Sequence, residues 1–125
     1  MIDIVIPEEQ EQELIFRWAA YESATHPELR MLYAIPNGGK RDRITGARLK
    51  ATGVKAGVPD MCLPVARGSY HGLYIELKRK KGGHVSDDQW NWLRDLIGYG
   101  YKAVVCKGFD EARATILDYL GIPGN

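Results

Sequence analysis

The spacing of apolar residues predicts helices in four segments, and each has a residue that favours a helix start or end. Pro7 is followed by glutamates that suit the positive end of a helix, and Ser86-x-x-Gln89 has the form of a capping box. Asp110 is predicted to be the N-cap of the last helix. Gly46 lies inside the second predicted helix, where glycine is unfavourable. The predicted helices span residues 7–24, 42–52, 86–98 and 110–120.

Four shorter apolar runs predict strands, and the third alternates strictly. Leu73, Ile75 and Leu77 share one face, while the other face carries Tyr74, Glu76 and Lys78. A strand–helix–strand unit near the end requires a right-handed parallel crossover, and the shorter earlier connections favour antiparallel neighbours. The order therefore predicts an α/β fold with a mixed β-sheet flanked by helices. The predicted strands span residues 31–35, 61–65, 73–79 and 102–106.

Length and composition fit one globular domain over residues 1–125. The chain is 45% hydrophobic and 26% charged, which is ordinary for a soluble domain. No apolar run reaches the roughly 20 residues that cross a bilayer, and the start lacks the features of a signal peptide, so we expect a cytoplasmic protein without membrane contact. Cys62 and Cys106 lie in apolar runs, which predicts small buried residues rather than a disulfide or a zinc site.

Charge is unevenly distributed although the net charge is only +1. Residues 37–81 carry 11 Lys or Arg against 3 Asp or Glu, whereas both flanking segments are acidic. Such a basic segment either is balanced by the rest of the protein or faces a polyanion, of which nucleic acid is the commonest. A basic stretch alone is more often simply solvated, so other features must decide.

Two carboxylates and a lysine are predicted to meet in one small volume. Asp60 follows the stiff turn Gly57-Val58-Pro59, and Glu76-Leu77-Lys78 lies on the next predicted strand. Glu76 and Lys78 share a face about 6.6 Å apart. Carboxylates that crowd together repel each other, and a divalent cation relieves that repulsion. Oxygen ligands favour Mg²⁺, with the Leu77 carbonyl as a third ligand and Lys78 beside a bound water that it would orient or deprotonate.

The same residues also have a purely structural interpretation. An aspartate at a turn is commonly a turn or capping residue, and E-x-K is an ordinary charge pattern on a strand. The order of the motifs and the basic segment around them favour the catalytic interpretation. Other chemistries fit less well, since the three histidines lack metal-ligand spacing and N-G-G-K at residues 37–40 lacks the phosphate-loop pattern.

These motifs together resemble the PD-(D/E)XK nuclease superfamily, and more narrowly its VRR-NUC branch. That branch occurs as stand-alone phage and bacterial proteins and as the nuclease domain of the Fanconi-associated nuclease. The resemblance covers roughly residues 8–120 and leaves no departure at the acidic or lysine positions. It rests on GVKAGVPD (53–60), YIELK (74–78), YAIPNGGKR (33–41), the S-x-x-Q helix start and YKAVVCKGFDEA (101–112).

The resemblance implies a restriction-endonuclease-like fold and specific site residues. Asp60, Glu76 and the Leu77 carbonyl would bind Mg²⁺ or Mn²⁺, Lys78 would orient the attacking water, and Gln89 would lie near the site. From the first helix, the resemblance points to Glu8 as the acid that completes the site, with Gln12 one turn further on. Two other first-turn acids, Glu9 and Glu11, are rivals because E-E-Q-E-Q-E offers several registers. All three glutamates would also suit the helix dipole.

The resemblance further implies a bacterial or phage-encoded DNA endonuclease that acts as a homodimer on branched DNA such as four-way (Holliday) junctions. A flap- or duplex-directed nuclease is the nearest alternative, and a non-catalytic nucleic-acid-binding module is another. Basic side chains would contact phosphates without reading sequence. They are Lys40, Arg41, Arg43, Arg48, Lys50, Lys55, Arg79, Lys80 and Lys81. The Asn37-Gly38-Gly39 amides would either approach a phosphate or form a turn.

Overall fold

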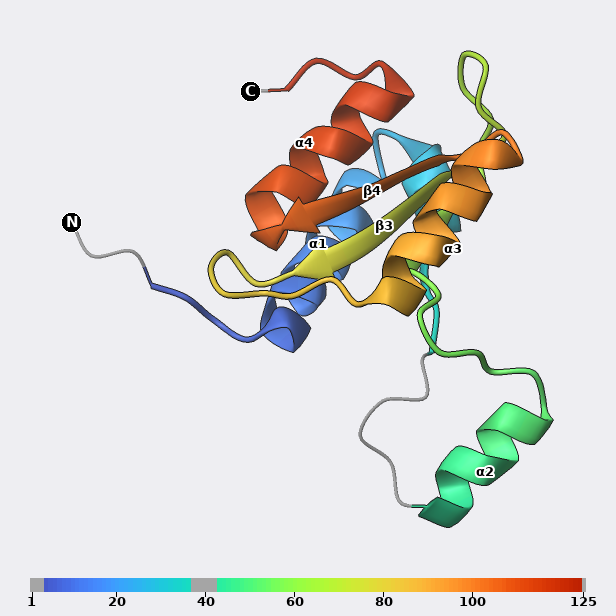
Figure 1. Ribbon diagram of the computed structural model, residues 1–125. Helices are drawn as coiled ribbons and strands as arrows, with labels where there is room; N and C mark the ends of the chain where they lie inside the picture. The colour runs from blue at the N-terminus through green and yellow to red at the C-terminus, as the bar shows by residue number, and fades with distance from the viewer. Residues whose placement is uncertain (1–3, 37–42, 125) are drawn as a thin grey trace.

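The computed structural model describes residues 4–36 and 43–124, with the backbone alone for residues 43–45. The described elements include the four predicted helices and four predicted strands in the predicted order, with one additional 3-10 helix after the first helix (Figure 1). In chain order they are α1 (Glu8–Glu22), the 3-10 helix η1 (Pro27–Met31), β1 (Tyr33–Ala34), α2 (Arg43–Ala51), β2 (Met61–Leu63), β3 (Leu73–Lys78), α3 (Asp87–Gly98), β4 (Lys102–Lys107) and α4 (Gly108–Leu120).

The four strands form one mixed sheet in the order β1-β2-β3-β4. The first three strands pair antiparallel, and β3 pairs parallel with β4. Helix α3 forms the crossover connection between β3 and β4. This arrangement confirms the predicted mixed sheet flanked by helices. Strand β3 therefore lies between β2 and β4, and β4 pairs with it over its whole length to Lys78.

Helices cover both faces of the sheet. Helices α1 and α4 pack side by side on one face, where the main core includes Ile15, Leu77 and Ile116 (Figure 1). Helix α3 packs on the other face through a smaller cluster around Leu93 and Leu96. Both predicted faces of β3 are consequently buried, and its polar residues lie on the side of α3. The two cysteines are free and buried, as predicted.

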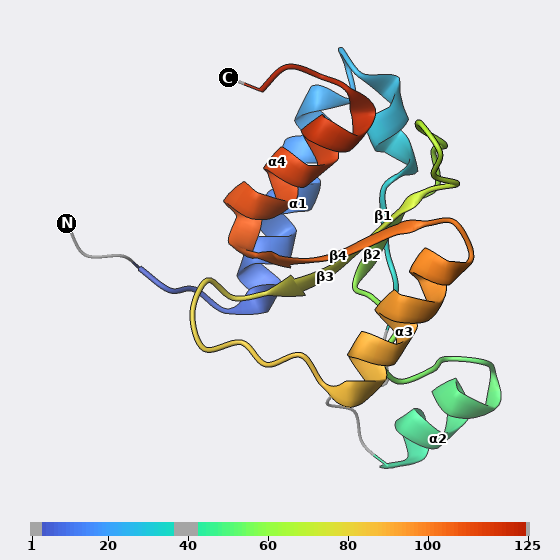
Figure 2. The same cartoon turned by 45° about the horizontal axis from the view of Figure 1, so that its top comes forward.

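Helix α2 projects away from the rest of the chain (Figure 2). It forms as predicted despite Gly46, and the chain leaves it through Gly53, whose φ of +104° lies in the left-handed region. The segment after α2 returns to the sheet and continues into Asp60 and β2. Among the described residues, no helix is long and apolar enough to cross a membrane.

Several predicted boundaries differ from the structure, with the largest shifts at β1, β2 and α4. Met31 belongs to η1, and β1 is reduced to two residues because the chain reaches the sheet only after buried Leu32. Strand β2 ends at Leu63, before Pro64, which cannot donate to a strand ladder.

Helix α4 begins earlier than predicted, and Asp110 lies in its first turn rather than at its N-cap. Gly108 allows this early start because its φ of +83° turns the chain directly out of β4. Glu111 Oε1 accepts a hydrogen bond from Lys107 N, the residue before the helix, at 2.9 Å.

Candidate active site

Glu76 and Lys78 lie side by side near the end of β3 and are both buried. They are 2% and 6% exposed, which is rare for charged residues unless they are paired. Lys78 Nζ lies 3.4 Å from Glu76 Oε2. The other carboxylate oxygen, Glu76 Oε1, is buried without a hydrogen-bond partner among the described residues. Burying a carboxylate oxygen without a hydrogen bond is costly, so Glu76 Oε1 is an acceptor suited to binding a hydrogen-bond donor or a cation.

Gln89 joins α3 to this pair. Its Nε2 donates to Glu76 Oε2 at 3.3 Å, and its Oε1 accepts from Lys78 Nζ at 3.1 Å. The same Oε1 accepts from Ser86 N at 2.8 Å, while Gln89 N donates to Ser86 Oγ at 3.2 Å. The predicted capping box is thus confirmed, and one side chain both caps α3 and contacts the buried pair.

Asp60 reaches the end of β3 from the turn before β2. The antiparallel ladder between β2 and β3 ends at the pair Met61 and Ile75. Beyond it, Asp60 Oδ2 accepts a hydrogen bond from Leu77 N at 2.6 Å and so continues the pairing through a side chain. The backbone is fixed as well, because Asp60 O accepts from Ile35 N at 2.8 Å.

The turn before Asp60 rests on α3. Gly57 has a φ of +87°, and a Cβ placed on it would lie 2.8 Å from Asp88 Cβ, closer than side chains tolerate. Pro59, which follows in the same turn, is fully buried. Because Asp88 precedes Gln89, this contact fixes the turn that carries Asp60 against the helix start that carries Gln89.

The electrostatics of Glu76 reflect this crowding. Burial raises the pKa of Glu76 to about 8, the charge of Asp60 and a hydrogen bond with it act in the same direction, and Lys78 opposes them. The Asp60 and Glu76 carboxylates are therefore close, as expected from the sequence. A second positive charge at this place would relieve both the repulsion and the cost of burial.

An open cleft separates Asp60 from the start of α1. It is lined on one side by Asp60 and Leu77 and on the other by Glu8, Glu9 and Gln12, with Glu13 and Phe16. The first turn of α1 therefore offers two of its three acids to the cleft. Gln12 lies one helical turn after Glu8 on the same side, as predicted.

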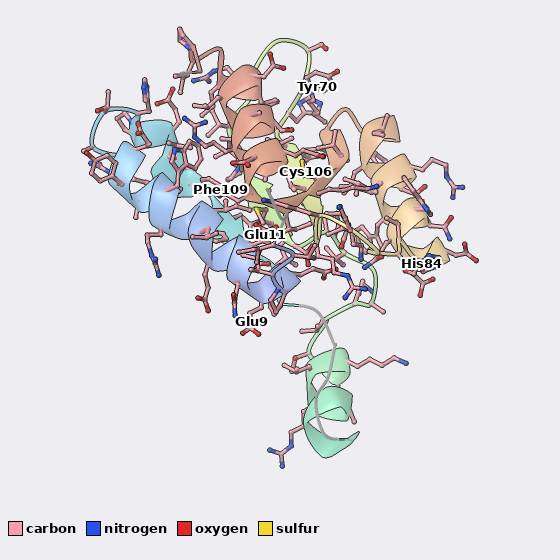
Figure 3. All side chains as sticks on the ribbon, turned by 90° about the vertical axis from the view of Figure 1, so that its left-hand side faces the viewer. Glu9, Glu11, Tyr70, His84, Cys106 and Phe109 are labelled. Atoms are coloured by element: carbon pink, nitrogen blue, oxygen red, sulfur yellow. The ribbon has the colours of Figure 1, made fainter. Side chains whose placement is uncertain are left out.

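Glu11 is directed elsewhere. It is 1% exposed and lies between α1 and α4, away from Glu9 (Figure 3). Its Oε1 accepts from Phe109 N at 3.2 Å, one of the first amides of α4, which have no partner within their own helix. A Cβ on Gly108 would lie 2.7 Å from Glu11 Oε2, so α4 begins directly against this carboxylate. Glu11 is therefore a structural cap and not a rival for the cleft.

This difference predicts contrasting effects on stability. Glu11→Ala leaves Phe109 N without its acceptor and is expected to lower the free energy of unfolding by about 1–3 kcal/mol. The matched variant Glu8→Ala removes an exposed acid from the same helix turn and is expected to cost only about 0.5 kcal/mol. Urea denaturation of both variants measures the difference, and equal losses would contradict the assignment.

The structure places the basic residues in two regions. Arg48 and Lys50 are exposed on α2, and Lys55 is exposed on the segment that returns from it. Lys80 and Lys81 follow β3 and line a shallow cleft with Lys107 at the start of α4. Arg79 is exposed beside them. Lys40 and Arg41, like residues 37–39, lie outside the described residues, and of Arg43 only the backbone is described.

Within the described part of the chain, no group of three His, Cys, Asp or Glu side chains lies together as a metal site. The site at the end of β3 offers two carboxylates instead, with the Leu77 backbone beside them. A cation there would be completed by a carbonyl and waters, which is the usual coordination of Mg²⁺ rather than of Zn²⁺.

Comparison with known proteins agrees with this arrangement. Residues 2–110 match the model of the VRR-NUC domain. A solved structure described as a "VRR_NUC domain protein" is 30% identical and superposes with a TM-score of 0.80, covering 94% of this chain and 90% of that one. A comparison with curated proteins finds no match.

Proposed function

The chain belongs to the VRR-NUC family, a nuclease family of the PD-(D/E)XK superfamily, and on this premise we propose that it is a metal-dependent DNA endonuclease. Its reaction is the hydrolysis of phosphodiester bonds in branched DNA such as four-way junctions. The observation that carries the proposal is the cluster formed by half-buried Asp60 and the buried pair Glu76 and Lys78. A protein that only binds DNA gains nothing from two crowded carboxylates beside a phosphate backbone.

The residues at the end of β3 fit a divalent cation. Glu76 Oε1 is a buried oxygen that lacks a partner among the described residues, and Asp60 supplies a second carboxylate nearby. Asp60, Glu76 and the Leu77 carbonyl are the proposed ligands of Mg²⁺ or Mn²⁺, with Glu8 as the proposed contributor from α1 across the cleft. A bound cation would lower the pKa of water and stabilise the negative charge that develops on the phosphate.

Lys78 and Gln89 position the water molecule that attacks the phosphodiester bond. Lys78 is held between Glu76 and Gln89, so its ammonium has a fixed position beside the carboxylates. From there it orients the attacking water, and its positive charge makes release of the water proton to solvent less costly. Gln89 fixes the lysine and is itself fixed by the backbone of Ser86, so little rearrangement is needed when DNA binds.

The basic residues supply affinity for the DNA backbone. Residues 43–59 contain four Lys or Arg and no carboxylate, and they include the projecting helix α2. This segment leads directly into Asp60, so phosphates bound along it continue toward the cleft. Lys80 lies two residues after Lys78, the last residue of β3.

Substitutions in this segment are expected to weaken binding to all DNA sequences alike. The double variant Arg48→Ala/Lys55→Ala should reduce the slope of log K against log salt by about 0.9 for each phosphate that the protein no longer neutralises. Binding measured by fluorescence anisotropy at several salt concentrations tests this. An unchanged slope would place α2 and its return segment off the DNA path.

A homodimer follows from the proposed substrate. One chain supplies one site, and cutting two strands of a junction symmetrically needs two sites related by a two-fold axis, the commonest symmetry of oligomers. Sedimentation at micromolar concentration is expected to show a dimer. A monomer that still resolves junctions by paired cuts would contradict this part of the proposal.

The substrate is tested by incubating purified protein with linear, flapped and four-way-junction DNA that share one labelled strand. Junction DNA is expected to be cut fastest, and only with Mg²⁺ or Mn²⁺. Faster cutting of flapped or linear DNA would show that the preferred substrate is that DNA and not the junction. If the protein binds these DNAs but cuts none of them in Mg²⁺ or Mn²⁺, the nuclease proposal is rejected in favour of a DNA-binding module.

A further inference from the structure

The side chain of Lys78 is enclosed along its length as well as at its ammonium. Only 8% of the side chain is exposed, although lysine usually keeps its stem mobile at the surface. The contacts with Glu76 and Gln89 fix the nitrogen alone. A four-carbon stem with this much rotational freedom needs a second contact to hold one conformation.

Gly83 provides that contact. The chain turns back after β3, and a Cβ placed on Gly83 would lie 2.9 Å from Lys78 Cβ and 3.4 Å from both Cγ and Cδ. The backbone of Gly83 thus lies against three consecutive carbons of the lysine stem. The nearest of these is Cβ, which cannot move without moving the strand.

The need for glycine at this position comes from Lys78 and not from the backbone. Gly82, its neighbour, has a φ of +78° and forms the turn, whereas the φ of Gly83 is not positive. An alanine at position 83 would therefore be acceptable in conformation and would still collide with Lys78. The two adjacent glycines serve different purposes.

The same loop holds both ends of the lysine. Gly83 packs on the stem, and Ser86, three residues later, donates from its backbone to the Gln89 oxygen that accepts from Lys78 Nζ. Any displacement of this loop therefore moves the stem and the ammonium together. Capping of α3 anchors the far end of the loop.

We propose that Gly83 is a positioning residue for Lys78, whose close backbone contact holds the ammonium in place for DNA cleavage. This inference rests on the proposed function. A side chain at position 83 displaces the lysine from Glu76 and Gln89, and the three nearest atoms that its Cβ meets all belong to Lys78. Displacement of a reacting group by about 1 Å can reduce a rate by about 100-fold.

The first test separates cleavage from binding. Gly83→Ala is expected to lower the single-turnover cleavage rate at saturating junction DNA and Mg²⁺ by about 100-fold. Its dissociation constant for DNA in EDTA should stay within about twofold of the wild-type value. Gly98→Ala is the matched control, because a Cβ there meets nothing within 4 Å and lies on α3, and its rate should be unchanged.

The second test follows Lys78 itself and does not depend on activity. Acetylation by a limiting reagent, followed by peptide mass spectrometry, reports how accessible each lysine is. Lys78 should react at least about tenfold faster in Gly83→Ala than in wild type or Gly98→Ala, while exposed Lys50 reacts equally in all three. Unchanged protection of Lys78, or full cleavage by Gly83→Ala, would overturn the role of Gly83.

A double variant covers the case in which Gly83→Ala folds poorly. Lys78→Gly removes the three nearest atoms that the new Cβ would meet, so adding Gly83→Ala to it should leave the melting temperature nearly unchanged. An equal drop in both backgrounds would overturn the contact. A wild-type protein that cleaves no DNA would instead overturn the proposed function, and with it this role in catalysis.

Discussion

Replacing Asp60, Glu76 or Lys78 with alanine is expected to abolish metal-dependent DNA cleavage, with each rate falling by at least about 100-fold. The three side chains form one cluster in which Glu76 and Lys78 are buried and Asp60 is half-buried, so no neighbour can substitute for a missing one. Affinity for DNA should change by less than about threefold, because the proposed phosphate contacts lie on α2 and after β3. Cleavage assays beside anisotropy measurements separate the two effects.

Asp118→Ala is the matched control for loss of a carboxylate. Asp118 is exposed on α4, and its side chain belongs neither to the cleft nor to the cluster of Asp60, Glu76 and Lys78. Its cleavage rate should equal that of wild type. Undiminished cleavage by Asp60→Ala would remove the proposed mechanism, and a general loss in Asp118→Ala as well would indicate damage to the fold.

The second large effect concerns stability without and with metal. In the metal-free protein the pKa of Glu76 is raised from its ordinary 4.5 to about 8 by burial and by Asp60. Between these values the folded protein holds a proton that the unfolded chain releases. Stability therefore falls as the pH rises from about 4.5 toward 8.

Asp60→Asn is expected to raise the melting temperature of metal-free protein at pH 7. The corresponding gain in the free energy of unfolding is on the order of 1 kcal/mol. The substitution removes a charge that repels Glu76 and keeps an oxygen that can accept from Leu77 N. The decline in stability between pH 4.5 and 8 should become shallower as the pKa of Glu76 falls.

The same substitution should reduce stabilisation by Mg²⁺. A cation that binds only the folded state adds about 2.7 kcal/mol at a hundredfold excess over its dissociation constant, and loss of one ligand removes most of this. Calorimetry of wild type and Asp60→Asn in EDTA and in about 10 mM Mg²⁺ measures both effects. If Asp60 were only a turn residue, Asp60→Asn would be less stable in EDTA and equally responsive to Mg²⁺.

Much of the site could be predicted because its residues lie close together in sequence or on a regular element. Strand alternation alone places Glu76 and Lys78 on one face of β3, and a tight turn before the neighbouring strand brings Asp60 to them. The S-x-x-Q pattern predicts the cap of α3. That Gln89 also contacts Glu76 and Lys78 depends on how α3 docks, which spacing does not encode.

The remaining features depend on contacts between distant segments. The acidic run at the start of α1 allows several registers, and only packing against α4 separates buried Glu11 from Glu8 at the cleft. Gly82 and Gly83 in sequence indicate no more than a break after a strand. The contact of Gly83 with Lys78 exists only once the loop has folded back onto β3.

The most direct test of a metal-dependent endonuclease uses closed circular DNA with an extruded cruciform, which offers a four-way junction and no ends. Wild-type protein stripped of metal is incubated with this DNA in EDTA and in Mg²⁺, and the products are mapped. We expect linear DNA cut at the base of the cruciform in Mg²⁺ and intact circles in EDTA. Intact circles in both Mg²⁺ and Mn²⁺, or equal cutting in EDTA, would contradict the proposed enzyme.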